Sequence, residues 1–341
     1  RVLIVGQGLA GTALGLELER AGMPFVIASE GHARAASMAA AGLVNPVQGQ
    51  RLVPVWRGAE LLRLAENWYR EAGVLLGAEL WHPLQLRRLF VNGTEAARAA
   101  RKLASGELTG FASALPEGGG LRIHGAAWVD LPALLARAAL RWEARGVLRE
   151  ASVTRDELHA DAAGVTWRGE RFGSAVLCVG AGPLVREFFP ELRFEAAKGQ
   201  IVRVAGAELP VGEAVSCGKW AIADAPGRAR VGATYERGIE DCVATTAARD
   251  ELLAAARAFV PGNLSFIEQR VGVRMSLPDR LPVTGWRVGA RIGVFGALGS
   301  KGTLFAPWLA RRWSEGLAGA TSGWPDALSV ARRGANPARE A

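Results

Sequence analysis

The sequence predicts an α/β fold built around a parallel sheet, with a second, antiparallel region, and three observations carry this prediction. A β-branched run at 2–5 leads through a glycine-rich turn into a helical pattern, after which a second apolar run occupies 25–28. A third apolar run, 174–179, also ends in glycines. Strands that are apolar throughout are typical of a parallel sheet buried on both faces. From 201 to 232, short apolar runs alternate with turn residues, which indicates antiparallel strands and an α+β region.

The first turn has the spacing of a dinucleotide-binding loop. Gly6 permits a tight turn, Gly8 lets the backbone approach a pyrophosphate, and Gly11 lets the following helix pack closely on the strand. The first amides of that helix and its dipole favour phosphate. Glu30 stands 19 residues after Gly11, where a carboxylate accepts hydrogen bonds from a ribose diol. An acid there disfavours NADP, so these residues alone leave NAD and FAD open.

The next segment departs from the regular strand–helix alternation of an NAD dehydrogenase. A short alanine-rich helix from about 35 to 41 ends at Gly42, and an extended stretch follows through Pro46. Small residues here would let a flat ring system lie against the backbone. The same pattern also fits a plain helix end at Gly42.

Helical periodicity predicts five further helices, and Asp130 is expected to cap one of them. They are expected at 56–77, 94–104, 131–145, 245–259 and 303–317. Short antiparallel strands are expected around Val153, at 158–160 and at 165–167.

Composition excludes several classes of protein. A chain of 341 residues that is 50% hydrophobic can bury large cores, which excludes whole-chain disorder and favours two domains. The chain has no uncharged apolar stretch of about 18 residues, so we expect no membrane span. The first fifteen residues lack the pattern of a cleaved signal peptide, and three scattered cysteines fit a reducing cytoplasm rather than a disulfide framework. No metal-ligand spacing is present.

The net charge is +8, and only four of the 41 basic residues are lysines. This charge permits a polyanionic partner. Nucleic acid is not favoured, however, because the arginines are dispersed and form no basic run of about 5–8 residues. A solvated basic surface explains the same composition.

Several ordered motifs resemble the D-amino-acid oxidase (DAO) family of FAD-dependent oxidoreductases over nearly the whole chain. Within that family, the chain resembles the branch of glycine oxidases and of the oxidase domain that modifies 5-methylaminomethyl-2-thiouridine in tRNA, and the Gly296–Gly302 motif carries the likeness to that oxidase domain. The motifs are the Gly6/Gly8/Gly11 turn with Glu30, the Ser37–Leu43 segment, the stretch around Val153, Val179-Gly180-Ala181-Gly182, Lys198-Gly199-Gln200, Gly272-Val273-Arg274 with Pro278–Gly285, and Gly296–Gly302.

The resemblance implies a Rossmann-like FAD-binding domain of the glutathione-reductase type with an inserted antiparallel-sheet substrate domain. The FAD-binding domain would combine 1–50, 120–185 and 270–325. The substrate domain would combine 51–119 and 186–269, and 326–341 would form a C-terminal tail.

The implied cofactor is FAD, bound non-covalently because no cysteine stands near the C-terminal motif. Val153 lies beside the adenine in the family. The expected cofactor-binding residues are Gly6, Gly8, Gly11, Glu30, Ser37, Ala41, Gly42, Leu43, Val153, Gly180, Gly182, Gly299, Ser300, Lys301, Gly302 and Thr303.

The implied activity is oxidation of the C–N bond of a small amine or amino acid, with electrons passing to dioxygen or another acceptor. A bidentate guanidinium holds a substrate carboxylate best, and Arg274 is the candidate, since a matching arginine projects over the flavin in the family. Arg51 and Arg57 are further candidates for the substrate pocket. Lys301 would stabilise the negative charge of the reduced flavin at the start of the last helix.

Two other hypotheses remain open at this point. The first is a tRNA-modifying flavoenzyme that acts on a carboxymethylaminomethyl-type uridine and uses the basic surface. The second is a flavin-binding protein that has lost its catalytic activity.

Overall fold

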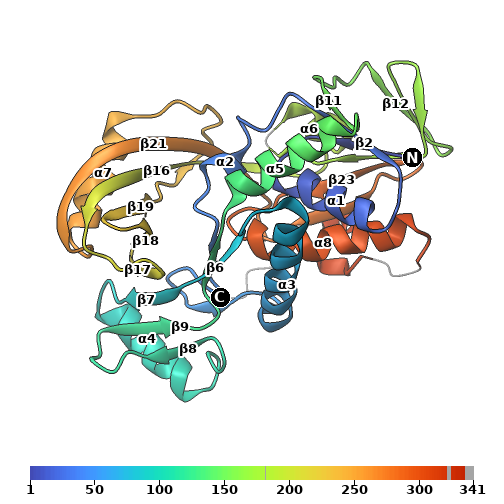
Figure 1. Ribbon diagram of the computed structural model, residues 1–341. Coiled ribbons are helices and arrows are strands. Elements are labelled where there is room, and N and C mark those ends of the chain that lie inside the picture. The colour runs from blue at the N-terminus through green and yellow to red at the C-terminus, as the bar shows by residue number, and fades with distance from the viewer. Residues whose placement is uncertain (181, 321–323, 335–341) are drawn as a thin grey trace.

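Two large sheets organise the chain, as the computed structural model shows (Figure 1). The structure describes residues 1–180, 182–320 and 324–334. Over these residues it contains one six-stranded sheet, on the right of Figure 1, and one nine-stranded sheet, on the left.

The helices lie mostly on the side of the six-stranded sheet. They are α1 (Leu9–Arg20), α2 (Ala36–Ala39), α3 (Gly58–Leu76), α4 (Gly93–Ala104), α5 (Leu131–Ala144), α6 (Pro183–Phe188), α7 (Thr246–Arg257), α8 (Gly302–Leu317) and the short 3-10 helices Asp326–Leu328 and Val330–Gly334.

The six-stranded sheet takes its strands from distant parts of the chain. In spatial order they are β11 (Leu148–Glu150), β2 (Phe25–Ser29), β1 (Val2–Val5), β15 (Ser174–Leu177), β23 (Ile292–Gly296) and β22 (Val283–Trp286). All neighbouring pairs are parallel except β22 with β23.

The nine-stranded sheet is mainly antiparallel. Its order is β20 (Glu236–Arg237), β16 (Glu195–Ala207), β19 (Arg228–Gly232), β18 (Lys219–Ala225), β17 (Glu213–Cys217), β7 (Gln85–Leu89), β9 (Gly120–Ile123) and β8 (Ala112–Ala114), and β21 (Gly262–Ser276) also pairs with β16. Only β17 and β7 pair in parallel within it.

Three smaller sheets complete the fold. One contains β3 (Leu43–Val44), β10 (Ala127–Val129) and β6 (Trp81–Pro83); one contains β12 (Leu158–Ala160), β13 (Val165–Trp167) and β14 (Glu170–Phe172); and one pairs β4 (Val47–Gln48) with β5 (Val53–Pro54).

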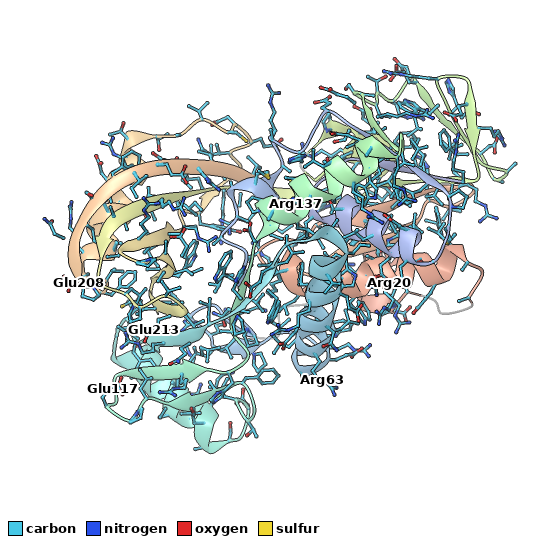
Figure 2. The ribbon with its side chains drawn as sticks, viewed as in Figure 1. Arg20, Arg63, Glu117, Arg137, Glu208 and Glu213 are labelled. Carbon is cyan, nitrogen blue, oxygen red and sulfur yellow. The ribbon has the colours of Figure 1, made fainter. Side chains whose placement is uncertain are left out.

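Both faces of the six-stranded sheet are buried, which explains why its strands are apolar throughout. In β1, Val2 and Ile4 pack into a core shared with α1, α3, α5 and α8, while Leu3 and Val5 pack into a second core on the opposite face. That second core includes α6 and the β12–β14 sheet. Arg20, Arg63 and Arg137 are exposed on α1, α3 and α5 (Figure 2).

The predicted elements are largely confirmed. The five helices expected from periodicity correspond to α3, α4, α5, α7 and α8, and each expected boundary lies within two residues of the observed one. Asp130 caps α5 by accepting a hydrogen bond from the Ala133 amide at 3.0 Å. The strand expected around Val153 is wrong: β11 ends at Glu150, and the chain then leaves the sheet in a loop toward β12. The antiparallel strands at 158–160 and 165–167 are confirmed.

The predicted division into two domains stays a prediction. Two segments bear on its boundaries. Strand β9 falls in the predicted FAD-binding segment 120–185 but belongs to the nine-stranded sheet. Helix α3 falls in the predicted substrate segment 51–119 but packs against α8 and α5. Of the expected C-terminal tail, 326–334 is described, and 335–341 lies outside the described residues. Within the described part of the chain, no helix has the length and apolar composition needed to cross a membrane.

Candidate active site

A cavity of about 1300 Å³ connects the two large sheets. Its walls come from the loop after β1, the segment 34–51, the ends of β15 and β23, and strands β16, β18 and β21. In open α/β sheets, ligands bind outside the carboxyl ends of the parallel strands, and one part of this cavity lies there. Its volume exceeds the roughly 300–1000 Å³ of a typical small-molecule pocket, so it has room for a dinucleotide and a substrate together.

The loop after β1 has the geometry that phosphate binding requires. Gly6 has a φ of +97°, and a Cβ atom on Gly11 would overlap the carbonyl oxygen of Gly6. Gly8 is the N-cap of α1 and provides no side chain to satisfy the first amides of the helix. The hydroxyl of Ser37 accepts a hydrogen bond from the Leu9 amide at 3.2 Å, which ties the second predicted segment to this turn.

Glu30 follows β2 and lines the cavity with its side chain exposed. Val153, in the loop after β11, lines the same end of the cavity, as do Gly180 and Gly182 after β15. All four residues therefore line one cavity, Val153 from a loop, and their role in binding the cofactor stays a prediction.

The segment 41–43 is pressed against β10. Gly42 has a φ of +69°, and a Cβ there would overlap the carbonyl oxygen of Val129, so only glycine fits. Arg230 donates a hydrogen bond from Nη1 to the carbonyl of Ala41 at 3.0 Å. Ala41, Gly42 and Leu43 all line the cavity.

The last helix begins at the cavity. Its first residues and the turn before them line the cavity: Gly299, Ser300, Lys301, Gly302 and Thr303. Lys301 is the N-cap of α8, and its side chain makes no hydrogen bond to the helix. The positive end of the α8 dipole therefore faces the cavity. Burial lowers the pKa of Lys301 below that of a free lysine, because its ammonium group loses hydration.

Arg274, on β21, places a half-buried guanidinium in the cavity wall. Its Nη2 donates to the carbonyl of Thr234 at 3.3 Å, and its Cζ lies 5.4 Å from the ring centroid of Tyr235. Burial lowers the pKa of Arg274, although this group remains a cation near neutral pH. No carboxylate of the described residues forms an ion pair with it, so an anionic ligand would complete its environment.

Of the two other arginine candidates, only Arg51 lines the cavity. Arg51 lines the cavity and is exposed. Arg57 is not part of the cavity lining: it forms an ion pair with Glu60, and its Cζ lies 5.4 Å and 5.5 Å from the rings of Trp56 and Trp308. Arg57 therefore joins α3 to α8 and does not reach the pocket.

Sequence reasoning missed several residues of the cavity lining, among them Arg34, Gln48, Trp220, Cys242 and Arg280. Gln48 follows the extended stretch through Pro46 that the sequence analysis describes, so an uncharged polar residue there is a usable signal. Trp220 comes from β18 and Cys242 from the loop before α7, and no local pattern connects either with the site.

These observations fit FAD. The turn after β1 is closed tightly: a Cβ on Gly6 or on Gly11 would overlap a backbone carbonyl oxygen, and Gly11 lies outside the cavity lining. Gly8 has open space around its Cα and lines the cavity, as does the carboxylate of Glu30, which could accept hydrogen bonds from a ribose. Farther along the cavity, the Nε2 of Gln48 is buried without a hydrogen-bond partner among the described residues, which suits a ligand that presents an acceptor there. The start of α8 directs its positive end into the cavity, which would suit the negative charge of a reduced flavin.

Known proteins resemble this chain over most of its length. It is 34% identical, over 99% of its own residues, to the tRNA 5-methylaminomethyl-2-thiouridine biosynthesis bifunctional protein MnmC of Maricaulis maris, but it spans only 55% of that protein. It is 29% identical to a glycine oxidase of Pseudomonas aeruginosa, with 84% of this chain and 85% of that protein covered. The chain thus spans about half the length of the bifunctional relative.

Solved structures show the same fold. The glycine oxidase of Geobacillus kaustophilus superposes with a TM-score of 0.83 at 22% identity, covering 96% of this chain and 97% of that one. The iminodiacetate oxidase of Chelativorans sp. BNC1 superposes with a TM-score of 0.79 at 22% identity, covering 96% and 98% of the two chains.

The model of the family described as FAD dependent oxidoreductase (DAO) matches residues 1–315. This match identifies the protein as an enzyme that uses FAD. The chain belongs to the DAO family of FAD-dependent oxidoreductases.

Proposed function

We propose that this enzyme oxidises the C–N bond of a small amino acid or amine whose carboxylate is bound by Arg274. The observation that supports it is the half-buried guanidinium of Arg274, which has no acidic partner among the described residues and lines the same cavity as the dinucleotide loop. A planar guanidinium pairs with a carboxylate through two parallel hydrogen bonds, which fix both position and orientation.

Bound FAD supplies the hydride acceptor, and the protein supplies the geometry. Arg274 would hold the carboxylate and so fix the direction in which the substrate's α C–H points, and such positioning accounts for much of the rate. The α-carbon would lose its hydrogen as a hydride, which the cofactor would accept, while the lone pair of the neutral amine forms the C=N bond of an iminium ion that then loses a proton to give the imine. Water then hydrolyses the imine to a carbonyl compound and a free amine. Lys301 and the α8 amides would stabilise the negative charge of the reduced cofactor. Dioxygen or another acceptor would then take the electrons from it.

A panel of amines and amino acids under anaerobic conditions tests the reaction class. Substrates that donate a hydride should bleach the flavin absorbance without dioxygen and should yield the carbonyl product after hydrolysis. The proposal fails if no amine bleaches the flavin while a hydroxy acid or another donor without nitrogen does so.

Replacing Glu30 with alanine should weaken FAD binding by roughly 1–3 kcal/mol, because hydrogen bonds from the ribose hydroxyls to a charged acceptor are lost. FAD affinity can be measured by titrating the apoprotein and following the flavin fluorescence. Glu150→Ala is a suitable control, since Glu150 is exposed and is absent from the cavity lining. Equal affinities in the Glu30 variant and the wild type would show that Glu30 is only a surface acid.

A second candidate function is oxidation of a carboxymethylaminomethyl-type uridine in tRNA. Arg34 and Arg51 favour it: both are exposed and line the cavity, and neither side chain has an ion-pair or hydrogen-bond partner among the described residues. They would place positive charge where a polyanion carrying such a nucleoside would approach. The identity to the bifunctional tRNA-modifying relative points in the same direction.

A salt titration of tRNA binding separates the two candidates. If tRNA is the substrate, its affinity should fall steeply as salt rises, because each neutralised phosphate releases counterions, and Arg34→Ala and Arg51→Ala should each flatten the slope by roughly one. A binding constant that is weak and hardly depends on salt would rule out tRNA and leave the small substrate.

A further inference from the structure

Gly199 and Arg274 are neighbours on one face of the β16/β21 pair. In this antiparallel pair, Gly199 lies opposite Gly272, and Ala197 lies opposite Arg274. Opposite residues of a ladder project to the same face, and so do residues two apart in a strand. Gly199 and Arg274 are therefore diagonal neighbours on the face toward the cavity, which both of them line.

The guanidinium of Arg274 lies over the backbone of Gly199. A Cβ atom on Gly199 would overlap Nη2 of Arg274 and would lie 3.1 Å from its Cζ and 3.4 Å from its Nε. The backbone of Gly199 is not in the left-handed region, so its conformation does not require glycine. The space that a side chain would take is instead occupied by Arg274.

Strand β16 also anchors the only hydrogen-bond acceptor that Arg274 contacts among the described residues, the backbone carbonyl of Thr234. The Thr234 carbonyl, which accepts from Arg274, belongs to a buried residue. Its amide donates to the carbonyl of Gln200 at 3.1 Å, and its hydroxyl accepts from the Gln200 amide at 2.9 Å. Gln200 directly follows Gly199, so one stretch of β16 leaves room for the guanidinium and anchors its partner.

We infer that Gly199 is a positioning residue for substrate binding. Because Gly199 has no side chain, the Arg274 guanidinium can lie against the backbone of β16, and from this position it can bind a carboxylate in the cavity. This inference rests on the proposed function. It adds that Arg274 is placed by its neighbouring strand, and that any larger residue at 199 lifts the guanidinium off that strand.

Gly199→Ala tests the inference without unfolding the protein. The clashing atoms are at the end of a flexible side chain, so Arg274 can swing away while the strand stays in place. The KM of an amino-acid substrate, and the Kd of a carboxylate inhibitor, should rise by about ten- to a hundredfold, as expected for a misplaced binding group. The FAD content, the thermal unfolding midpoint and the Kd of an amine without a carboxylate should stay at wild-type values. Ala205→Ser, on the same strand but absent from the cavity lining, should change none of these quantities.

A double-mutant cycle with Arg274→Ala separates positioning from general damage. Adding Gly199→Ala to Arg274→Ala should weaken carboxylate binding no further, because the group that Gly199 positions is gone. A wild-type Kd in Gly199→Ala, beside a weakened Kd in Arg274→Ala, would overturn the inference alone, and so would an equal loss in both backgrounds. A wild-type Kd in Arg274→Ala itself would overturn the assignment of the substrate site, and with it the proposed function.

Discussion

Replacing Arg274 with lysine should weaken the binding of an amino-acid substrate about ten- to a hundredfold while the FAD content stays normal. Lysine keeps the positive charge but loses the planar pair of donors, and a charge-assisted hydrogen bond is worth roughly 1.5–3 kcal/mol. Stopped-flow traces of flavin bleaching against substrate concentration give the half-saturation value directly. The limiting rate at saturation should fall less than the affinity if Arg274 acts mainly in binding.

Arg270→Lys is the matched control for this change. Arg270 lies four residues earlier on β21 and is absent from the cavity lining, and it pairs with Glu268 at 2.9 Å. Its replacement should leave half-saturation unchanged. If Arg274→Lys also saturates like the wild type, the substrate carboxylate is not bound at Arg274, and Arg51 becomes the next residue to test.

Replacing Lys301 with methionine should impair electron transfer rather than binding. Removing one group that stabilises developing negative charge costs on the order of a hundredfold in rate at comparable sites. Flavin reduction or reoxidation should therefore slow, and the flavin potential should fall, while half-saturation stays nearly the same. Lys102→Met, on α4 beside Glu107, provides a control outside the cavity.

The pH dependence of the same step identifies the active form of Lys301. Burial lowers the pKa of Lys301, so its ammonium loses a proton at a lower pH than the roughly 10.4 of a free lysine. If the ammonium is the active form, the rate should be full below that lowered pKa and should fall as the pH rises through it. Lys301→Met should lack this alkaline fall, and a fall that persists unchanged in the variant would assign it to another group.

The cofactor half of the site could be predicted from the sequence because its requirements are local. A strand, three spaced glycines, a helix and an acid at a fixed distance predict a dinucleotide loop. In the structure Gly11 packs against the carbonyl of Gly6, and Gly6 and Glu30 line the cavity. Periodicity likewise located the larger helices, since one face of each packs on the core.

The substrate side could be predicted only in part, because distant segments assemble it. Arg57 was expected in the pocket, but Trp308, from the other end of the chain, contacts its guanidinium and α3 holds it away. The partner of Arg274 is a backbone carbonyl of Thr234, which no side-chain pattern reveals. Gly199 belonged to a recognised motif, yet its role depends on a register between two strands.

The most direct test of this account compares one amino acid with its decarboxylated amine in anaerobic single-turnover reduction of the wild-type enzyme. If Arg274 holds the substrate carboxylate in the flavin cavity, the amino acid should half-saturate at a concentration about ten- to a hundredfold lower than the amine, and Arg274→Lys should remove most of that preference. Equal half-saturation by the two compounds in the wild type, or a preference that survives in Arg274→Lys, would contradict it.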